Sequence, residues 1–174
     1  MVSAKAALEC FHTLSEAFVA VADGFSDEAW VIRPPGEEWS ASQTVEHVHE
    51  TNERTLRRLR RGLVGEAPTP TGRSVADEKI VETMFHGISP PPGIPGPVGC
   101  FATSLEGREA MAAICNAIAE CVREGGDRLR TFGFAHPVFG DFDGVQWILF
   151  LAAHTENHVP QLRRLKDSVG RTKR

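Results

Sequence analysis

The amino-acid sequence predicts an all-α protein: a four-helix bundle with a long Pro- and Gly-rich crossing connection between its second and third helices. Four long stretches carry apolar residues at helical spacing, capping residues or glycines mark their ends, and no long stretch alternates apolar and polar residues. Amphipathic helices without competing strands are typical of helical bundles. With 174 residues and 41% hydrophobic content the chain suits one core, so residues 1–174 are predicted to form a single domain.

The first two helices are predicted from their apolar stripes and their ends. The first helix is predicted over residues 3–23, and the glycine that follows ends it. The next stretch, through Arg33-Pro34-Pro35-Gly36, is predicted to be loop. Ser40 is a suitable N-cap, and Gln43 completes a capping box, so the second helix is expected to run from there to about Leu63. The stripe of the first helix comprises Ala7, Leu8, Phe11, Leu14, Phe18 and Val21.

Residues 64–103 have a different composition. Proline and glycine recur there, most densely over residues 89–97, and they surround one short helical pattern over residues 75–86. A connection of this length in a compact protein is often functional. We expect it to cross the bundle, where it can roof a pocket.

The last two helices are marked by the same signals. The third is predicted over residues 105–124, with either Thr103 or Ser104 as its cap and Gly125-Gly126 as its stop. The fourth is predicted to begin after Asp143, which repeats the capping box with Gln146, and to continue through residue 165.

The charge of the chain argues against nucleic acid as a partner. A formal net charge of -4, from 19 basic and 23 acidic residues, produces no field that would hold a polyanion. The basic run Arg57-Arg58-Leu59-Arg60-Arg61 follows Glu46, Glu50 and Glu53, and glutamates one turn before arginines support an exposed helix surface. The run is therefore predicted to be a solvated helix end.

Membrane and redox signals point to a soluble cytoplasmic protein. The longest apolar run, residues 147–153, is far shorter than the roughly 18 residues of a membrane span. The four cysteines show no C-x-x-C spacing, which fits reduced thiols. Three of them lie in apolar helical context and are predicted to be buried: Cys10, Cys115 and Cys121.

The most informative feature is the pair His154 and His158. Four residues apart in a predicted helix, their imidazoles lie on one face, where two ring nitrogens can reach one transition metal at roughly 2 Å. The second helix offers His47 and His49 as a third ligand, but a separation of two residues rotates them by about 200°, so only one can join. The apolar pattern does not choose between them, with His49 slightly closer to the core face. Pro160 lacks a backbone N–H and predicts a bend that would tilt His158.

Two motifs carry a family resemblance. Trp39-Ser40 is followed by His47, and a Trp-led last helix carries His154, His158 and Gln161. With these motifs the chain resembles the DinB-like metalloenzyme superfamily, which includes bacillithiol transferases and mycothiol-dependent isomerases. The resemblance implies a four-helix bundle with a three-histidine metal site, which makes His47 the third ligand beside the pair. It also implies a homodimer.

The carboxylates are weaker candidates for chemistry. Glu50, one turn past His47, can orient a ligand or act as a general base, although a surface ion pair with Arg54 is the favoured interpretation. Glu156 resembles the base of a zinc protease motif, but it is rotated by about 200° from His154 and is rejected. Asp141-x-Asp143-Gly144 is interpreted as a turn and N-cap rather than a calcium loop.

The isolated histidines are predicted to be structural or exposed: His12, His86 and His136.

Three histidines without a carboxylate suit Zn²⁺, Ni²⁺ or Fe²⁺, with positions left for water or a substrate thiolate. The leading hypothesis is therefore a metal-dependent enzyme, such as a thiol S-transferase or a hydrolase. The metal would activate water or a low-molecular-weight thiol for transfer, isomerisation or hydrolysis of a small substrate. The alternative is a non-catalytic module in which the same bundle binds a small molecule or a dimer partner, since no clear protein base is present.

Overall fold

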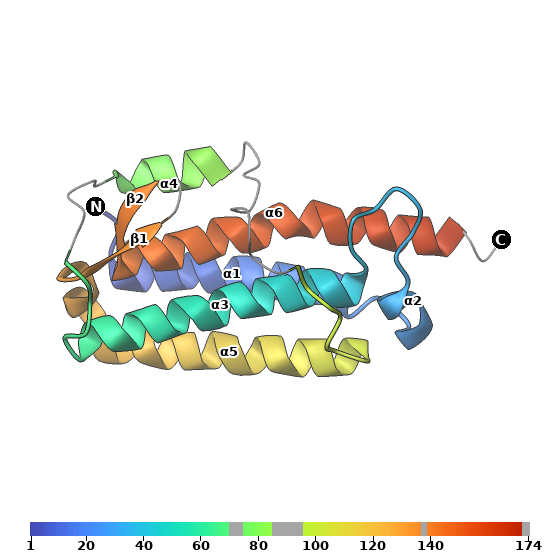
Figure 1. The fold of residues 1–174 in the computed structure, drawn as a ribbon, viewed down its shortest axis with the longest axis horizontal. Helices are drawn as coiled ribbons and strands as arrows, with labels where there is room; N and C mark the ends of the chain where they lie inside the picture. The colour runs from blue at the N-terminus through green and yellow to red at the C-terminus, as the bar shows by residue number, and fades with distance from the viewer. Residues whose placement is uncertain (70–74, 85–95, 137–138, 172–174) are drawn as a thin grey trace.

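Four long helices lie side by side in the computed structural model: α1 (Ala4–Ala22), α3 (Ala41–Leu63), α5 (Ser104–Gly125) and α6 (Gly144–Arg171) (Figure 1). The structure describes residues 1–69, 75–84, 96–136 and 139–171. Helix α6 packs on α1 and α3, and α5 packs on the same two helices, so the four form a closed ring. The predicted four-helix bundle is confirmed.

The direction of the helices explains the crossing connection. Helices α1 and α6 run one way along the bundle, and α3 and α5 run the other way (Figure 1). Because α3 and α5 are parallel neighbours, the chain must return along the whole bundle between them. The described part of the connection contains a short helix, α4 (Asp77–Met84), which packs on α6. Other parts of it, including residues 85–95 with His86, lie outside the described residues.

The predicted helix starts are confirmed by their capping hydrogen bonds. The Ser3, Ser40 and Thr103 side chains each accept a bond from the backbone N–H three residues ahead. The Ser40 backbone N–H in turn donates to Oε1 of Gln43, which completes the predicted capping box. Asp143 and Gln146 exchange the same two bonds at the start of α6.

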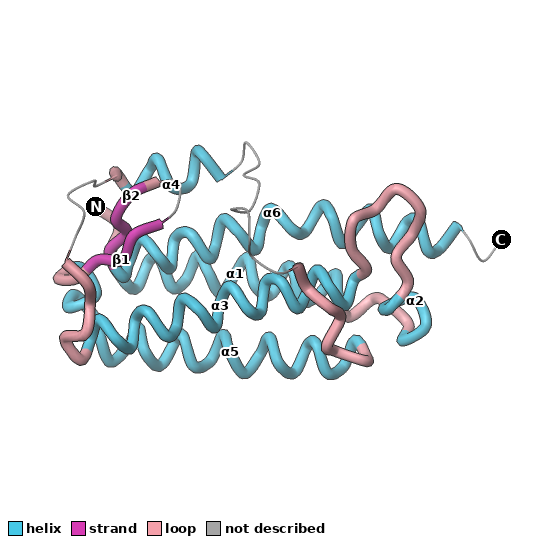
Figure 2. The backbone as a smooth tube through the Cα atoms, in the orientation of Figure 1, coloured by secondary structure: helices cyan, strands magenta, loops and turns pink. Residues whose placement is uncertain are grey.

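Helix α2, a short β-hairpin and a 3₁₀ turn were not predicted. Helix α2 (Asp27–Val31) lies in the stretch predicted to be loop, and it buries Trp30, whose Nε1 donates to the carbonyl of Phe101 at 2.9 Å. A short antiparallel hairpin, β1 (Gly133–His136) and β2 (Gly140–Asp143), pairs Phe134 with Phe142 (Figure 2). It follows a 3₁₀ turn, η1 (Gly126–Arg130). Strands of four residues are too short to show the alternation on which sequence prediction relies.

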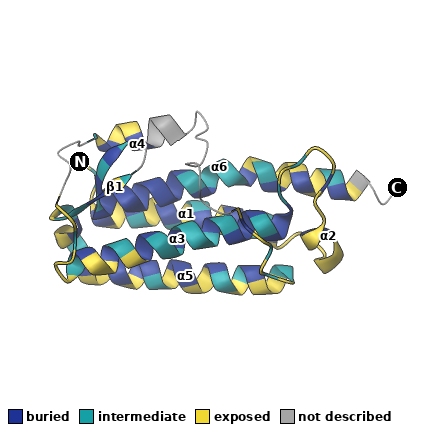
Figure 3. Cartoon of the chain, in the orientation of Figure 1, coloured by how far each residue is buried: buried dark blue, intermediate teal, exposed yellow. Residues whose placement is uncertain are grey.

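The buried faces of the long helices meet along the axis of the bundle (Figure 3). The core is apolar, but α3 also buries Asn52 and Thr55 completely. Cys115 and Cys121 are buried as predicted, whereas Cys10 is exposed, so its predicted burial was wrong. Within the described ranges, no helix combines the length and the apolar character that a membrane span requires.

Candidate metal centre

Three histidines meet where α3 and α6 pack together. His47, His154 and His158 each offer one ring nitrogen, and these three atoms all lie within 4.8 Å of one another. The ring centroids are 4.8 to 5.0 Å apart. We call these three side chains the imidazole cluster. His154 and His158 share a face of α6 because they are four residues apart, and α3 brings His47 to them from the opposite side of the cluster.

The spacing of the ring nitrogens suits a metal ion. Nε2 of His47 and Nε2 of His154 are 3.1 Å apart. Two nitrogens bound at 2.0–2.1 Å to one tetrahedral ion are about 3.3 Å apart, so little movement would be needed. The second ring nitrogen of His154, Nδ1, is buried and has no hydrogen-bond partner in the described part of the chain. If Nε2 of this ring faces the cluster with its lone pair, Nδ1 carries the proton and is a buried donor without an acceptor among the described residues.

His158 is oriented by a side chain one turn further along α6. Its Nδ1 lies 2.8 Å from Oε1 of Gln161, and donation to that oxygen leaves Nε2 with a free lone pair. Pro160 lies between the two residues, and α6 continues through it to Arg171. The bend expected at Pro160 therefore does not remove His158 from the cluster.

Burial keeps the imidazole cluster neutral. Desolvation, followed by the proximity of His158 and Arg54, lowers the pKa of His47 to about 4. Desolvation and the neighbouring histidines lower the pKa of His154 well below its ordinary value, and burial also lowers the pKa of His158 despite its bond to Gln161. Neutral imidazole is the form that binds metal, so all three rings are ready to act as ligands at physiological pH.

Aromatic rings enclose the cluster on two sides. Trp39 lies 4.7 Å from His47 and is stacked near His158 at 6.2 Å, measured between ring centroids. Phe150, one turn before His154, stacks on that ring at 5.6 Å. The sequence marked Trp39 only as part of a motif, and the structure shows that its side chain forms a wall of the site.

The other histidine of α3 faces a different part of the molecule. The His49 ring meets Phe101 edge-on at 5.5 Å, on the loop that leads into α5. The rotation of about 200° between two helical positions explains why His47 and His49 cannot share a site.

Two glutamates of α3, Glu46 and Glu50, have different partners and different exposure. Glu50 forms an ion pair with Arg54 and does not join the cluster. Glu46, predicted to support an exposed helix surface, is instead buried and accepts hydrogen bonds from the backbone N–H groups of Gly99 and Cys100. That prediction was wrong because the partners of Glu46 lie more than fifty residues away in the sequence.

The remaining acidic candidates lie elsewhere. Glu156 lies close enough to Cys10 of α1 to raise the pKa of that thiol, an effect second to that of burial. Asp143 caps α6 and pairs with Arg130, as its interpretation as an N-cap implies. Neither residue contributes to the imidazole cluster.

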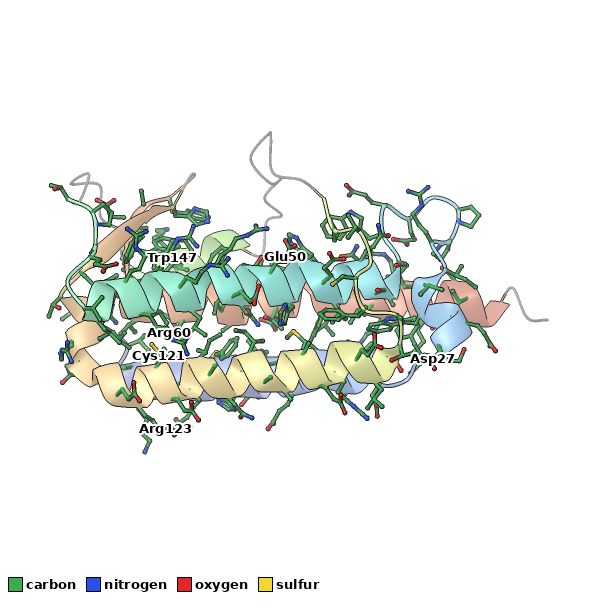
Figure 4. All side chains as sticks on the ribbon, turned by 60° about the horizontal axis from the view of Figure 1, so that its bottom comes forward. Asp27, Glu50, Arg60, Cys121, Arg123 and Trp147 are labelled. Atoms are coloured by element: carbon green, nitrogen blue, oxygen red, sulfur yellow. The ribbon has the colours of Figure 1, made fainter. Side chains whose placement is uncertain are left out.

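An aromatic cluster continues the site along α6. His136 of β1 contacts four rings, at centroid distances of 4.8 to 5.6 Å: Phe139, Phe142, Trp147 and Phe150. We call these five residues the aromatic cluster. Burial, and then the proximity of Arg58, lowers the pKa of His136 to about 4. The guanidinium carbon of Arg58 lies 4.5 Å from the centre of the Trp147 ring. Figure 4 shows Trp147 and Glu50 along the same edge of α3.

Comparison with known proteins adds to this geometry. The family model described as the DinB superfamily matches residues 11–162. The Bacillus subtilis (strain 168) protein named "Uncharacterized protein YuaE" is 25% identical over 154 residues, which are 85% of this chain and 90% of that protein. A solved structure, "Crystal structure of TT2238, a four-helix bundle protein", has a TM-score of 0.55 at 21% identity, over 95% of this chain and 100% of that one. This structural likeness supports the fold alone.

Proposed function

We propose that this chain, which belongs to the DinB superfamily, is a metal-dependent enzyme that acts on a small substrate. The observation that carries the proposal is the convergence of three neutral imidazoles from two helices, with ring nitrogens within 4.8 Å of one another. Histidines that lie on a helix face by chance have no reason to converge. Bringing three together buries their polar ring nitrogens, which is unfavourable unless those atoms have a partner. A divalent cation gives that arrangement a function.

The donor set suggests which cations would bind. His47, His154 and His158 would hold Zn²⁺, Ni²⁺ or Fe²⁺, because imidazole suits these ions and three ligands leave a position open. When bound, such an ion lowers the pKa of a coordinated water or thiol and so supplies a nucleophile near neutral pH.

The side chains around the cluster would prepare it for this chemistry. Gln161 holds the His158 proton at Nδ1 and keeps Nε2 free. Trp39 and Phe150 cover two sides of the rings, which limits the access of water and strengthens electrostatic interactions inside the site. Burial keeps each imidazole unprotonated without help from a neighbouring carboxylate.

The absence of a carboxylate from the cluster narrows the reaction class. Among the described residues the cluster contains histidines only, and Glu50 is engaged by Arg54. The proposed nucleophile is therefore a water molecule or a low-molecular-weight thiol rather than a protein side chain. Transfer, isomerisation and hydrolysis are the reactions that such a nucleophile supports, and the family resemblance favours the thiol.

Turnover after metal reconstitution tests the proposal. Metal-free protein would be loaded separately with Zn²⁺, Ni²⁺ and Fe²⁺ and assayed with low-molecular-weight thiols paired with small electrophiles, and with hydrolysable esters. We expect turnover with at least one ion, lost in His154→Ala and kept in His49→Ala. Stoichiometric metal uptake without turnover on any substrate would favour the non-catalytic binding module. Failure to take up metal would contradict the metal centre itself.

The homodimer and the cytoplasmic location are further parts of the proposal. Both rest on the family resemblance or on composition, and sedimentation of the purified protein tests the first of them.

A further inference from the structure

One arginine of the basic run on α3 differs from its neighbours. Arg57, Arg60 and Arg61 are exposed, as expected of a solvated helix end, whereas Arg58 is half-buried. Arg57 and Arg61 each pair with a glutamate. Across the described ranges no carboxylate pairs with Arg58, whose guanidinium lies instead on the face of Trp147. The prediction of a solvated run is therefore wrong at this position.

The charge of Arg58 is poorly compensated. Burial, and then the proximity of Arg54 and Arg57, lowers the pKa of its guanidinium, while the glutamates nearby pair with those two arginines and not with Arg58. Aromatic faces attract a cation, but more weakly than a carboxylate in hydrogen-bonding contact. In the same contact, Nε1 of Trp147 is buried and has no acceptor among the described residues. Two donors therefore lie together without an anionic partner.

This pair of donors is aligned with the imidazole cluster. Trp147 precedes His154 by seven residues, which is two helical turns on one face of α6, or about 10 Å along the helix axis. Phe150 lies between them and contacts both rings. On α3, Arg58 follows His47 by eleven residues, which returns it to nearly the same face. The contact between Arg58 and Trp147 therefore lies further along the same faces of α3 and α6 that carry the imidazole cluster.

We infer that Arg58 and Trp147 form a subsite for the carboxylate end of a substrate whose reacting atom lies at the imidazole cluster. This inference rests on the proposed function and extends it by naming the substrate class. The planar fork of a guanidinium matches the two oxygens of a carboxylate, and the indole N–H supplies a further donor. Phe150 between the two places would contact an apolar middle segment. The substrate is therefore a carboxylic acid with about 10 Å between its anionic group and its reacting atom.

Binding of a mercapto acid to the zinc-loaded protein tests the subsite. The probe is 8-mercaptooctanoate, long enough to span the two places, compared by calorimetry with its methyl ester, which lacks the anionic group. We expect the acid to bind at least about tenfold more tightly than the ester. We expect Arg58→Gln to remove that preference by weakening the acid alone, and Arg58→Lys to retain part of it. Arg57→Gln, one residue away but exposed, should leave the preference unchanged.

A second measurement separates failure of the subsite from failure of the proposed function. Octanoate, which has no thiol, would be titrated into metal-free protein, where we expect binding that Arg58→Gln weakens and Arg57→Gln does not. Equal binding of acid and ester, or equal loss in the two glutamine variants, overturns the subsite even if zinc uptake is stoichiometric. If zinc fails to bind but octanoate binding depends on Arg58, the proposed function fails and the anion site stands. Unchanged helical circular dichroism in both variants shows that each is folded.

Discussion

The bundle has two seams between antiparallel helices, and they differ sharply. The α3–α6 seam holds the imidazole cluster, with neutral rings that point at one another. The α1–α5 seam contains an open groove lined mostly by small or apolar side chains, with one histidine, His12. Its charged residues include Arg108 and Asp23, which pair with each other in an exposed position.

This difference shows that the open groove and the convergent histidines lie in different parts of the bundle. The α1–α5 groove has one histidine and, among the described residues, no group of three possible metal ligands, so a ligand there would gain mainly apolar contact from side chains such as Val19, Ala20 and Met111. At the α3–α6 seam, burial removes the charge of the histidines and leaves their lone pairs available. We therefore propose that the chemistry of this protein lies at the α3–α6 seam rather than in the open groove.

The largest expected effect is loss of metal from the α3–α6 seam. His154→Ala removes the ring that contacts both other histidines, so we expect stoichiometric uptake of Zn²⁺ or Ni²⁺ to be abolished. Helical content should change little, because the bundle is held by its apolar stripes. Plasma spectrometry of the purified variant measures the uptake. His12→Ala, in the other seam, is the matched control, and equal loss in that variant would remove the distinction between the seams.

The second prediction concerns pH and the metal-free protein. Unfolded histidines titrate near 6.5, whereas His47 and His136 titrate at about 4 in the folded state. Between these values the unfolded state binds more protons, so the free energy of unfolding falls as the pH falls from about 6.5 to about 4. For each of these residues the loss is on the order of 3 kcal/mol. Ordinary imidazoles would release metal below about pH 6, and these should retain it to a lower pH.

Thermal unfolding with and without Zn²⁺, repeated at several pH values between 7.5 and 4, measures both effects. We expect the melting temperature of metal-free protein to fall across this range, and Zn²⁺ to raise it at pH 7.5 by mass action. A variant with Gln at positions 47, 154 and 158 should show a shallower pH dependence and no response to Zn²⁺. If the variant and the native chain respond equally to Zn²⁺ at pH 7.5, the ion binds outside the α3–α6 seam.

The third prediction separates the two histidines of α3. His47→Ala should weaken metal affinity by more than tenfold, as loss of a direct ligand does, while the pair on α6 retains residual binding. His49→Ala should have little effect, because that ring contacts Phe101 instead. Competition with a chelator of known affinity measures both constants. The opposite result would mean that α3 presents its other face to α6.

Local signals explain what the sequence could predict. The capping pairs of Ser40 with Gln43 and of Asp143 with Gln146 each span three residues, and the histidine pair of α6 spans four, so each can be identified within one helical turn. The choice between His47 and His49 needed the family resemblance, because the apolar pattern of α3 places them on opposite flanks of one face. The composition of residues 64–103 predicted a long crossing connection, whereas the direction of each helix came from the structure.

Long-range contacts explain what the sequence could not predict. Trp30 is held by the carbonyl of Phe101, and Glu46 by the amides of Gly99 and Cys100, all distant in the chain. Ser26 with two acidic residues after it was a signal for α2 that could have been used. No sequence pattern marks Arg58 as the one arginine that lies on Trp147, because that contact depends on how α3 and α6 pack.

The smallest expected effect lies at the rim of the α1–α5 groove. Arg108→Ala removes the ion pair with Asp23, whose side chains are 39% and 54% exposed, so solvent already screens the attraction. We expect the free energy of unfolding, from urea denaturation, to change by less than about 1 kcal/mol, and by less still in high salt. Zinc affinity should be unchanged, since the pair is not part of the imidazole cluster. A loss of more than about 2 kcal/mol, or a change in zinc affinity, would show that the two seams are coupled and that the chemistry of the bundle is not confined to α3 and α6.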